Sequence, residues 1–551
     1  MYAIHEALAP MGSTALSVRR LITKSPARLG GLAALPAKIR LGQRMYSLVA
    51  RHKGRYRSPS LPPSPTDAAR RAETKPKERI VILGSGWAGY AFARTLDPAK
   101  FERIVVSPRS HFVFTPLLAG TAVGTIEFRA VLEPVRRLGP VTFHQGWADD
   151  VDFARKVVRV EPVVNPDAAE LAGHGLVPPP PAAATPPQLL DVPYDKLVVA
   201  VGAYSQTFGV PGVRAHAHFL RDVADARRIR LRVLSLFEAC ASPALDDEAR
   251  RRLLRFAVVG GGPTGIEFAA ELHDLIRDDL ARLYPTLAPL ASIAVYDIAP
   301  AVLPMFDRQL AAYAADTFRR QGIEVHTGHH LEAIRDDPAS PAAGLRLRFR
   351  EHGDDEVAVG MVVWSTGLMQ NPLVEKLVRR EFRMPGALDG AGSLAHLAKD
   401  PKTGGVVTDS QLRARIAPVQ APGDTAVPGE ASTGAVLPDV FVLGDCSVVE
   451  TDAALPKTAQ VASQQAAYLA KALNRDALGA APFRFRNWGT MAYLGSWRAI
   501  HQSSADEIKG RAAWVLWRTA YLTYSMSVRN KIMVPVYWLV SWLFGRDISR
   551  F

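Results

Sequence analysis

Cysteine is nearly absent from this chain, which holds only two cysteines in 551 residues. Cys240 and Cys446 lie far apart, and no CxxC or CxxxxC spacing occurs anywhere. A disulfide framework, a cysteine metal site and a redox-active dithiol of adjacent cysteines are therefore excluded, and no metal site is predicted.

Long apolar runs are missing as well. The run Ile532 to Phe544 has thirteen residues and contains Pro535, whereas a membrane span needs about twenty apolar residues.

Acidic residues are scarce at the two ends of the chain, and this scarcity accounts for the net charge of +14. Residues 1–57 hold eleven Lys or Arg against one acid, and residues 511–551 hold six against one. The body between them is close to neutral, so a basic body that grips DNA is absent and no nucleic-acid partner is predicted. With 48% hydrophobic and 22% charged residues, the chain is long enough for two or three globular domains.

The first segment lacks the apolar stretch of a secretion signal. Residues 1–57 are instead rich in Arg, contain Ser, and interleave these with Leu, Ala and Met, which is the composition of a mitochondrial presequence. A basic tail without a targeting role is the alternative. A Pro/Ser-rich linker, residues 58–76, separates this segment from the first predicted strand.

Glycine, by contrast, is concentrated in two turns of one kind. Gly84, Gly86 and Gly89 follow the β-branched run 79–83 and open a helical stretch. The same arrangement follows residues 256–259, with glycines Gly260, Gly262 and Gly265. Such glycines let the backbone turn tightly and approach a pyrophosphate, which the helix N-terminus behind them stabilises. Because each copy follows a strand and precedes a helix, we predict that the chain binds two dinucleotides.

The two units differ after their turns, and one is nested in the other. An acidic residue is usually expected at the end of the second strand to hold a ribose; Ser107 stands there in the first unit and Asp297 in the second. Strands that run into glycine turns return the chain to each sheet, at residues 194–202, 361–367 and 440–445. We therefore expect an α/β fold of two Rossmann-type dinucleotide-binding domains, the second inserted in the first.

Five motifs carry a resemblance to a known family. They are residues 114–118 (FTPLL), 260–272 (GGGPTGIEFAAEL), 455–465 (LPKTAQVASQQ), 491–495 (MAYLG) and 542–547 (WLFGRD). Together with the nested units, they resemble the two-dinucleotide flavoprotein reductases and, more narrowly, the type II NADH:quinone oxidoreductases, the single-subunit alternative NADH dehydrogenases of fungal mitochondria. The resemblance covers residues 77–551.

The resemblance implies a domain plan and a function. FAD would occupy residues 77–245 and 371–485, NADH would occupy 246–370, and 486–551 would bind the membrane or a second copy. The implied function is a non-proton-pumping, rotenone-insensitive-type NADH:ubiquinone oxidoreductase of the mitochondrial respiratory chain. A hydride would pass from NADH to non-covalently bound FAD, and two electrons would then pass to ubiquinone.

The resemblance also implies cofactor contacts. The FAD pyrophosphate would lie on the first glycine turn, the flavin beside Thr115 and Pro116, and the ribityl chain on Asp445. Further predicted cofactor-binding residues are Trp87, Gly202, Gly367 and Gly444. NADH would lie on the second turn, with Asp297 accepting hydrogen bonds from the ribose and repelling a 2′-phosphate, so NADH is favoured over NADPH. For either aspartate, a strand-end turn is the alternative.

Three residues are candidates for the chemistry itself. Glu267 lies in the first turns of the second helix, and the resemblance places it between nicotinamide and flavin; a carboxylate that favours the helix dipole is the alternative. Gln460 and Gln464, one helical turn apart, belong to the segment that the resemblance assigns to quinone, with Ser463 where fungal relatives carry His. A plain solvated helix face would also explain them.

Aromatic residues are spaced as on a helix near the C-terminus. Between Arg511 and Arg529 they predict an interfacial amphipathic helix, and the run Ile532 to Phe544 should lie on the bilayer. We predict peripheral binding to the inner mitochondrial membrane, either on the matrix face or on the intermembrane-space face, and a homodimer. A soluble core helix is the alternative. A sulfide:quinone oxidoreductase and an apoptosis-factor-like flavoprotein remain alternative functions, disfavoured by the cysteine spacing and the neutral body respectively.

Overall fold

The computed structural model describes residues 76–163, 188–340, 344–383, 394–419, 435–504 and 506–549. The chain divides into two compact units, Met1–Pro76 and Lys77–Phe551, and the described residues fall almost wholly in the second. The predicted presequence and nearly all of the predicted linker lie outside the described residues.

The first sheet is built around parallel strands. β1 (Glu78–Leu83) lies between β2 (Phe101–Ser107) and β8 (Lys196–Val199), and β23 (Val436–Val442) continues beyond β8. The last four residues of β1 are fully buried, because a parallel strand covered on both faces needs apolar side chains on both. Helix α5 (Trp87–Thr95) connects β1 to β2, so the first predicted βαβ unit is confirmed.

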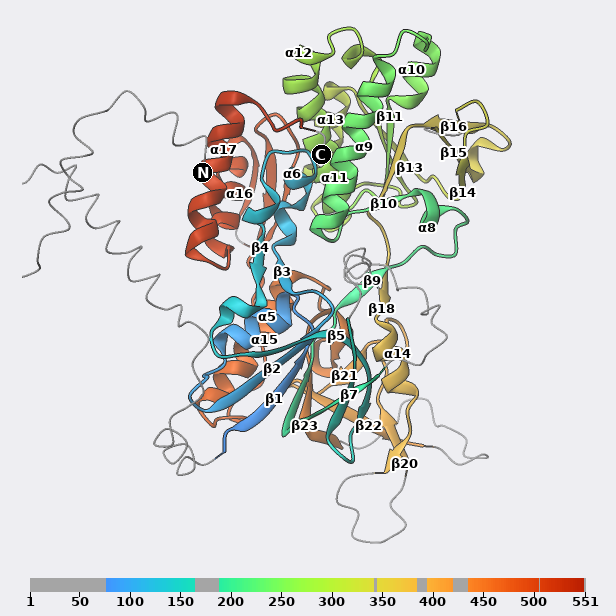
Figure 1. Ribbon diagram of the computed structural model, residues 1–551. Helices are drawn as coiled ribbons and strands as arrows, with labels where there is room; N and C mark the ends of the chain where they lie inside the picture. Colours follow the sequence, from blue (N-terminus) through green and yellow to red (C-terminus); the bar gives the residue numbers. More distant parts are fainter. Residues whose placement is uncertain are drawn as a thin grey trace, which may run out of the picture. The chain divides into compact units, whose positions relative to one another are not determined.

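Further strands extend this sheet at both edges. They are β5 (Thr142–Asp152), β6 (Val157–Pro162) and β7 (Leu190–Pro193) beyond β2, and β22 (Arg413–Pro418), β20 (Leu394–Leu397) and β19 (Phe382–Arg383) beyond β23. Helix α15 (Ala459–Asn474) packs beside α5 on one face, and α14 (Pro372–Arg379) packs on the other (Figure 1). Helices on both faces account for the apolar central strands.

The second sheet is parallel throughout its described strands. Its order is β10 (His218–Phe219), β17 (Met361–Trp364), β11 (Arg255–Val259), β12 (Ser292–Asp297) and β13 (Ile323–Thr327). Helix α11 (Pro263–Leu275) follows the second glycine turn between β11 and β12, which confirms the second βαβ unit. Helices α9 (Val223–Cys240) and α13 (Arg308–Gln321) belong to the same part of the chain.

The second sheet is inserted in the first, as the returning strands at residues 361–367 and 440–445 predicted. The chain leaves the first sheet through β9 (Ala203–Ser205) and returns through β18 (Leu368–Gln370), and these two strands pair antiparallel (Figure 1). The predicted domain limits stay a proposal: β10, at residues 218–219, already belongs to the second sheet although it precedes the proposed limit at residue 246.

The C-terminal region combines a small meander with two helices. The meander consists of β25 (Thr490–Tyr493), β26 (Ala499–Gln502) and β27 (Glu507–Gly510). Helix α16 (Arg511–Tyr524) and helix α17 (Val528–Phe544) follow, drawn in red in Figure 1. The predicted helix through Arg529 is therefore two helices, because the Ser527 hydroxyl accepts a hydrogen bond from the Asn530 amide and starts α17 there. Within the described ranges, no helix is long and apolar enough to cross a membrane.

The aromatic stripe on residues 511–529, which was predicted to lie at a membrane interface, turns its central Trp517 into the protein core instead. Trp517 is only 5% exposed, and its ring lies 5.4 Å from that of Tyr493. Its indole nitrogen donates a hydrogen bond to Glu267, 250 residues away in the sequence. A buried hydrogen-bond acceptor thus draws the stripe inward, and this partner could not be read from local periodicity.

One hydrophobic cluster joins the two dinucleotide-binding units. It contains Ile80 and Ile82 of β1, Phe256 and Val258 of β11, and Trp517 of α16. Elements from both nested units and from the C-terminal region therefore share this cluster, while the opposite face of each sheet packs into a cluster of its own.

Candidate active site

The first glycine turn has the geometry of a pyrophosphate cradle. Gly84 has φ +105°, and a Cβ there would lie 2.3 Å from the carbonyl oxygen of Ala200. A Cβ on Gly89 would lie 2.0 Å from the Gly84 oxygen, whereas one on Gly86 would meet nothing within 4 Å. Gly84 and Gly89 thus permit close packing of strand and helix, and Gly86 leaves open space above the N-terminus of α5.

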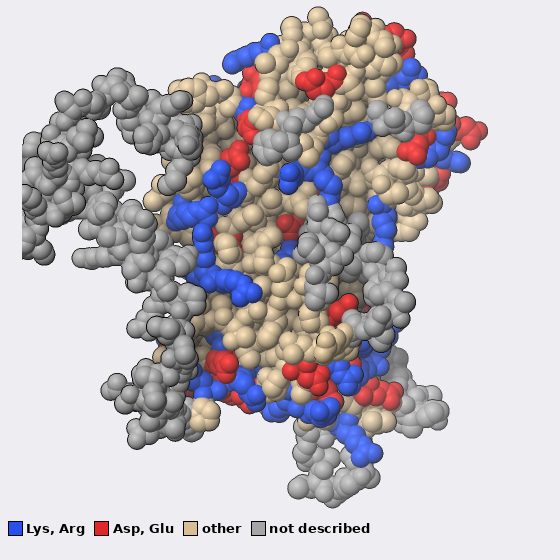
Figure 2. All heavy atoms as spheres, in the orientation of Figure 1, with Lys and Arg blue, Asp and Glu red and all other residues tan. Residues whose placement is uncertain are grey.

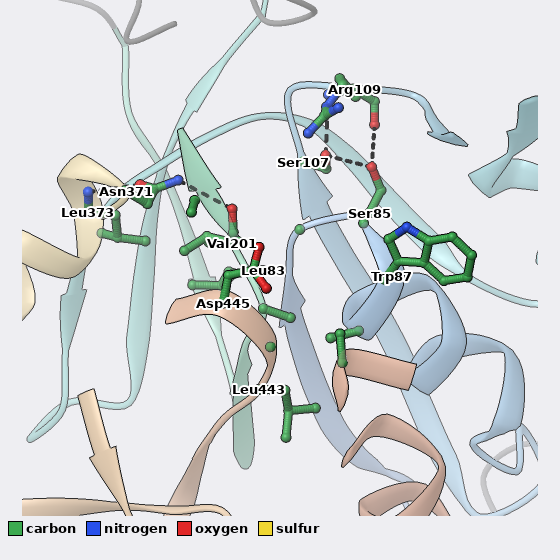
Figure 3. A pocket seen from close by; sticks show the side chains of 18 of the residues that line it. Leu83, Ser85, Trp87, Ser107, Arg109, Val201, Asn371, Leu373, Leu443 and Asp445 are labelled. Carbon is green, nitrogen blue, oxygen red and sulfur yellow. Dashed lines mark hydrogen bonds between the residues drawn. The ribbon is translucent and has the colours of Figure 1, made fainter. Parts of the chain in front are cut away.

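A cavity of about 200 Å³ opens from this turn at the carboxyl ends of the strands. Of the predicted site residues, six line it: Gly84, Gly86, Trp87, Gly202, Gly444 and Asp445. Figure 3 shows Asp445 in the middle of this cavity, with Trp87 at one side and Asn371 at the other. Its position outside the carboxyl ends of a parallel sheet is where such folds bind ligands.

Asp445 is held at the end of β23 by a residue that the sequence did not single out. The Gly444 amide donates a 2.7 Å hydrogen bond to the side-chain oxygen of Gln465, a buried residue of α15. Burial raises the pKa of the Asp445 carboxyl, while the charges of Arg221 and Lys457 oppose that rise. The backbone before Asp445 is therefore fixed, and Asp445 lines the cavity.

At the other end of the cavity, the lining residue Ser107 forms hydrogen bonds that support the turn. Its hydroxyl lies 2.9 Å from that of Ser85 and accepts a hydrogen bond from the Arg109 amide at 3.2 Å (Figure 3). Ser107 is 3% exposed, so a carboxylate there would be buried among partners that are already satisfied. The missing acid in this unit is thus replaced by a hydroxyl network.

Two lining residues offer donors to a ligand in this cavity, and both escaped the sequence analysis. The Trp147 indole nitrogen is buried and, among the described residues, has no hydrogen-bond partner. Burial lowers the pKa of the Arg221 guanidinium, which the nearby Asp445 carboxylate counteracts. Neither residue belongs to a motif. Only the order of the strands in the folded chain brings them to the cavity.

Three other predicted cofactor residues lie away from this cavity. Thr115 accepts a 3.0 Å hydrogen bond from the Trp87 indole, and Pro116 lines a second cavity described below. Gly367 has φ +76° and lies against Gln206 and Phe208 at the crossing between the sheets. A cofactor contact for Thr115, Pro116 or Gly367 remains a proposal.

The second glycine turn repeats the geometry of the first. Gly260 has φ +116°, and a Cβ there would meet the backbone of Ser365 at 2.9 Å. A Cβ on Gly265 would lie 2.0 Å from the Gly260 oxygen, and one on Gly262 would meet nothing within 4 Å. The three glycines therefore correspond one by one to those of the first turn, which supports a second dinucleotide site.

Asp297 ends β12 beside this turn. One carboxylate oxygen accepts a hydrogen bond from the Gly261 amide, and the other accepts one from the Ala299 amide at 2.7 Å. The residue thus fixes the glycine turn, and the second lone pair on each oxygen remains for a ligand hydroxyl. The loop from Asp297 to Ala301 contains no Lys or Arg.

Glu267 lies beside a second, small cavity, of about 10 Å³, between α11, α16 and α17. It is 7% exposed, and its Oε1 accepts hydrogen bonds from the Tyr493 amide and the Trp517 indole, both at 3.1 Å. Burial raises the pKa of Glu267 to about 8 in spite of these bonds. The carboxyl faces residues of other elements rather than the amides that begin α11, so a helix-dipole role does not account for it.

Gln460 and Gln464 use their amides to hold the segment before β25. Gln460 donates to the Gly489 carbonyl at 2.7 Å and accepts from the Trp488 amide at 3.1 Å. Gln464 forms a similar pair of bonds with Arg486. Neither is a plain solvated side chain, since each glutamine clamps the backbone. Whether they touch quinone is untested; nearby, the Ser463 hydroxyl is buried without a partner among the described residues.

The two cysteines are free and buried, in α9 and just after Asp445. Burial raises the pKa of both thiols to about 11. A thiol that stays protonated is a poor nucleophile, so the geometry agrees with the exclusion of cysteine chemistry.

Comparison with known proteins identifies the family. Residues 78–466 match the family model described as pyridine nucleotide-disulphide oxidoreductase, and residues 488–547 match that of the NDH2 C-terminal domain. The chain is 31% identical to the external alternative NAD(P)H-ubiquinone oxidoreductase B3, mitochondrial, of Arabidopsis thaliana, over 87% of this chain and 91% of that one. It is 29% identical to the external alternative NADH-ubiquinone oxidoreductase, mitochondrial, of Yarrowia lipolytica, over 95% and 86% of the two chains.

A solved structure supports the same fold. NDH2 from Plasmodium falciparum in complex with NADH is 21% identical and superposes with a TM-score of 0.69, over 86% of this chain and all of that one. The expectation drawn from the five motifs is confirmed. The chain belongs to the pyridine nucleotide-disulphide oxidoreductase family and, within it, to the type II NADH dehydrogenases.

Proposed function

We propose that this protein oxidises NADH and reduces ubiquinone without pumping protons. The observation that carries the proposal is the pair of matching glycine turns, one opening a large cavity and the other followed by Asp297. A chain of this family with two such turns has one place for a resident FAD and one for a dinucleotide substrate. The names of the alternative NADH and NAD(P)H-ubiquinone oxidoreductases that it resembles agree with this reaction.

The first cavity suits FAD. The open space above Gly86, the α5 N-terminus and the Arg221 charge would hold the pyrophosphate, and Asp445 would accept a hydrogen bond from the ribityl chain. The unpartnered Trp147 indole faces the same space. When bound there, FAD supplies the two-electron chemistry between nicotinamide and quinone.

The second turn suits NADH. The Gly262 amide region would hold the pyrophosphate, and the Asp297 carboxylate would accept hydrogen bonds from the adenosine ribose. Because the following loop contains no cation and Asp297 is anionic, a 2′-phosphate would be repelled. NADH is therefore the preferred substrate.

Glu267 is proposed to hold a proton at the reaction centre. Its Oε1 accepts both protein hydrogen bonds, which leaves Oε2 as the atom that carries the acid proton. The small cavity beside it is lined by Trp514, Trp517 and Trp538, whose apolar surfaces shield the carboxyl from bulk water. Gln460 and Gln464 would act by holding the segment that leads into β25.

Anaerobic mixing tests the reaction. NADH should bleach the flavin absorption of the purified protein, and added ubiquinone should restore it. Sulfide in place of NADH should leave the absorption unchanged. Flavin that NADH does not bleach would contradict the proposal.

The outer face of α17 is proposed as a membrane-binding surface. Its exposed apolar residues include Val528, Ile532, Leu539, Trp542, Leu543 and Phe544, and Ile532 is 60% and Phe544 82% exposed. Arg529 and Lys531 lie at the start of the same helix. In Figure 2 the surface over α17 is mostly tan, with blue Lys and Arg spheres along its lower part. An apolar helix face bordered by cations fits an anionic lipid surface better than a second copy of the same cationic face.

Vesicle binding tests this surface. The double variant Ile532→Glu with Leu543→Glu should lose sedimentation with vesicles that contain anionic lipid, while Leu394→Glu, at another exposed apolar residue, should keep it. Light scattering on the same samples measures the predicted homodimer. If the double variant dissociates a dimer and still binds vesicles, α17 is a dimer seam instead.

The location at the inner mitochondrial membrane is also a proposal. Relatives are named mitochondrial, and the basic residues 1–57 agree with import, so we place the protein at the inner membrane. Protease protection in mitochondria with an opened outer membrane would determine the face, and with it whether matrix or cytosolic NADH is oxidised.

A further inference from the structure

Helix α11 carries a row of buried carboxyls on one face. Glu267, Glu271 and Asp274 follow one another at spacings of four and three residues, and each is at most 7% exposed. Residues at these spacings lie above one another on a helix. Helix α5, the counterpart in the first unit, has no acidic residue at all. Because burying carboxyls is unfavourable, three in a row call for a role that packing does not supply.

Glu271 has a built environment at the wall of the second cavity. Its Oε2 accepts a 2.9 Å hydrogen bond from the Thr125 hydroxyl. Its Oε1 comes so close to α6 (Leu118–Ala122) that a Cβ on Gly120 would lie 3.2 Å away. The absence of a side chain at Gly120 thus leaves the space that the carboxyl occupies.

The C-terminal end of the chain supports this environment from outside. Arg546, just after α17, donates from Nε to the Thr125 hydroxyl at 3.0 Å and from Nη1 to Asp279 at 2.6 Å. Arg518 of α16 faces the same cavity, with its guanidinium 4.4 and 4.3 Å from the rings of Trp514 and Trp538. The charged groups facing Glu271 are therefore these two arginines and its neighbours Glu267 and Asp274.

The row also reaches the surface. Asp274 accepts a 2.6 Å hydrogen bond from the Tyr493 hydroxyl and lies 3.5 Å from the guanidinium of Arg277, whose side chain is 44% exposed. The three carboxyls therefore extend from the cavity around Glu267 to the solvent-facing end of α11. Burial raises the pKa of Glu271, whereas hydrogen bonds, foremost from His273 and Tyr493, hold that of Asp274 low against the effect of burial.

The proposed reaction needs one proton from water in each turnover. NADH gives a hydride, which is two electrons and one proton, while ubiquinone takes two electrons and two protons to become ubiquinol. The balanced reaction is NADH + H⁺ + quinone → NAD⁺ + quinol. A proton must therefore cross from solvent into a cavity that excludes bulk water.

We propose that Glu271 relays this proton to Glu267, with Thr125 and Arg546 positioning its carboxyl. Glu271 does not touch the substrates in this proposal and acts only by passing the proton to Glu267. This inference rests on the proposed function, and it adds a route that neither the family match nor the glycine turns contain.

The test compares two halves of the reaction in Glu271→Gln. Bleaching of the flavin by NADH needs no proton from this route and should keep its rate, while quinone-dependent turnover should fall about tenfold or more. In the pH profile of quinone-dependent turnover, the high-pH limb should shift to lower pH. A solvent deuterium isotope effect on kcat should also appear. Glu133→Gln is the matched control, since Glu133 is another buried glutamate with a side-chain donor, Asn530.

Two further variants keep the inference testable. Thr125→Val removes a hydrogen bond that lowers the pKa of Glu271, so the high-pH limb should shift by a smaller amount in the opposite direction, to higher pH. Glu271→Asp should recover part of the turnover. An unchanged pH profile in Glu271→Gln, or loss of flavin in both Glu271→Gln and Thr125→Val, would overturn the relay. Failure of the unmodified protein to reduce quinone would overturn the proposed function instead.

Discussion

The two dinucleotide-binding units share one backbone device and differ in the side chains that follow it. In both units the first glycine has a positive φ. A Cβ on the third glycine would lie 2.0 Å from the carbonyl oxygen of the first, so only glycine lets the helix pack against the turn. The first unit then uses buried hydroxyls, at Ser107, and a helix without acids; the second uses Asp297 and a helix with three buried carboxyls. On the proposed function, the shared turn would hold a pyrophosphate in each unit, and the side chains after it would distinguish the resident FAD from the substrate NADH.

The largest expected effect is loss of the resident cofactor in Gly89→Ala. The new Cβ would lie 2.0 Å from the Gly84 oxygen and force α5 away from β1. We expect the purified variant to hold roughly a hundredth or less of the flavin of the unmodified protein, which corresponds to a loss of about 2.8 kcal/mol of binding or more. Flavin absorption after desalting measures it. Full flavin content would show that the first turn does not cradle FAD.

Gly265→Ala makes the matched change in the second unit. Here the Cβ would meet the Gly260 oxygen at 2.0 Å and the Ser365 hydroxyl at 2.5 Å. Flavin content should stay unchanged, while the KM for NADH should rise on the order of 100-fold because the pyrophosphate seat is displaced. Steady-state kinetics with ubiquinone gives the KM. If this variant loses flavin and keeps its KM, the assignment of the two units is reversed.

Asp297→Asn should have a smaller effect on the same constant. Asparagine lacks the negative charge and keeps only one of the two acceptor oxygens that bind the Gly261 and Ala299 amides. We therefore expect about a tenfold rise in the KM for NADH and a smaller preference for NADH over NADPH. Ser107→Ala, at the corresponding strand position of the other unit, serves as control and should change that KM less than about twofold. Equal changes in both variants would contradict the distinction between the units.

The smallest effect concerns stability and the acids that only α11 carries. Glu267 has a pKa of about 8 in the folded protein against an ordinary value of 4.5. Between these pH values the unfolded chain loses a proton that the folded chain keeps, so stability falls as the pH rises through this window. Glu267→Gln removes the penalty, and its Tm relative to the unmodified protein should rise by a few degrees from pH 5 to pH 8. A pH-independent difference, measured by scanning fluorimetry, would count against a protonated Glu267.

Local signals in the sequence predicted most of the fold. β-branched runs next to glycine turns specified both βαβ units, and the returning strand 361–367 indicated the insertion, because each signal lies within about thirty residues. The aromatic stripe of α16 was misread because its direction depends on Glu267, a residue of another element. A periodic pattern identifies one face of a helix without saying what covers it.

The candidate site divides in the same way. Gly84, Gly260 and Asp297 stand at fixed places in a motif and were found. Arg221 and Trp147 reach the first cavity from elements with no motif, and only the strand order brings them there. Gln465 follows two glutamines that were singled out, yet it is the one that holds Gly444.

The shared hydrophobic core bears on how the enzyme works over time. Since side chains of β1, β11 and α16 belong to one cluster, swinging one unit away from the other would tear a packed interior. We therefore expect the two units to keep one relative arrangement through the catalytic cycle. The same continuity predicts that residues 77–551 melt in a single cooperative calorimetric transition, and two separate transitions would contradict it.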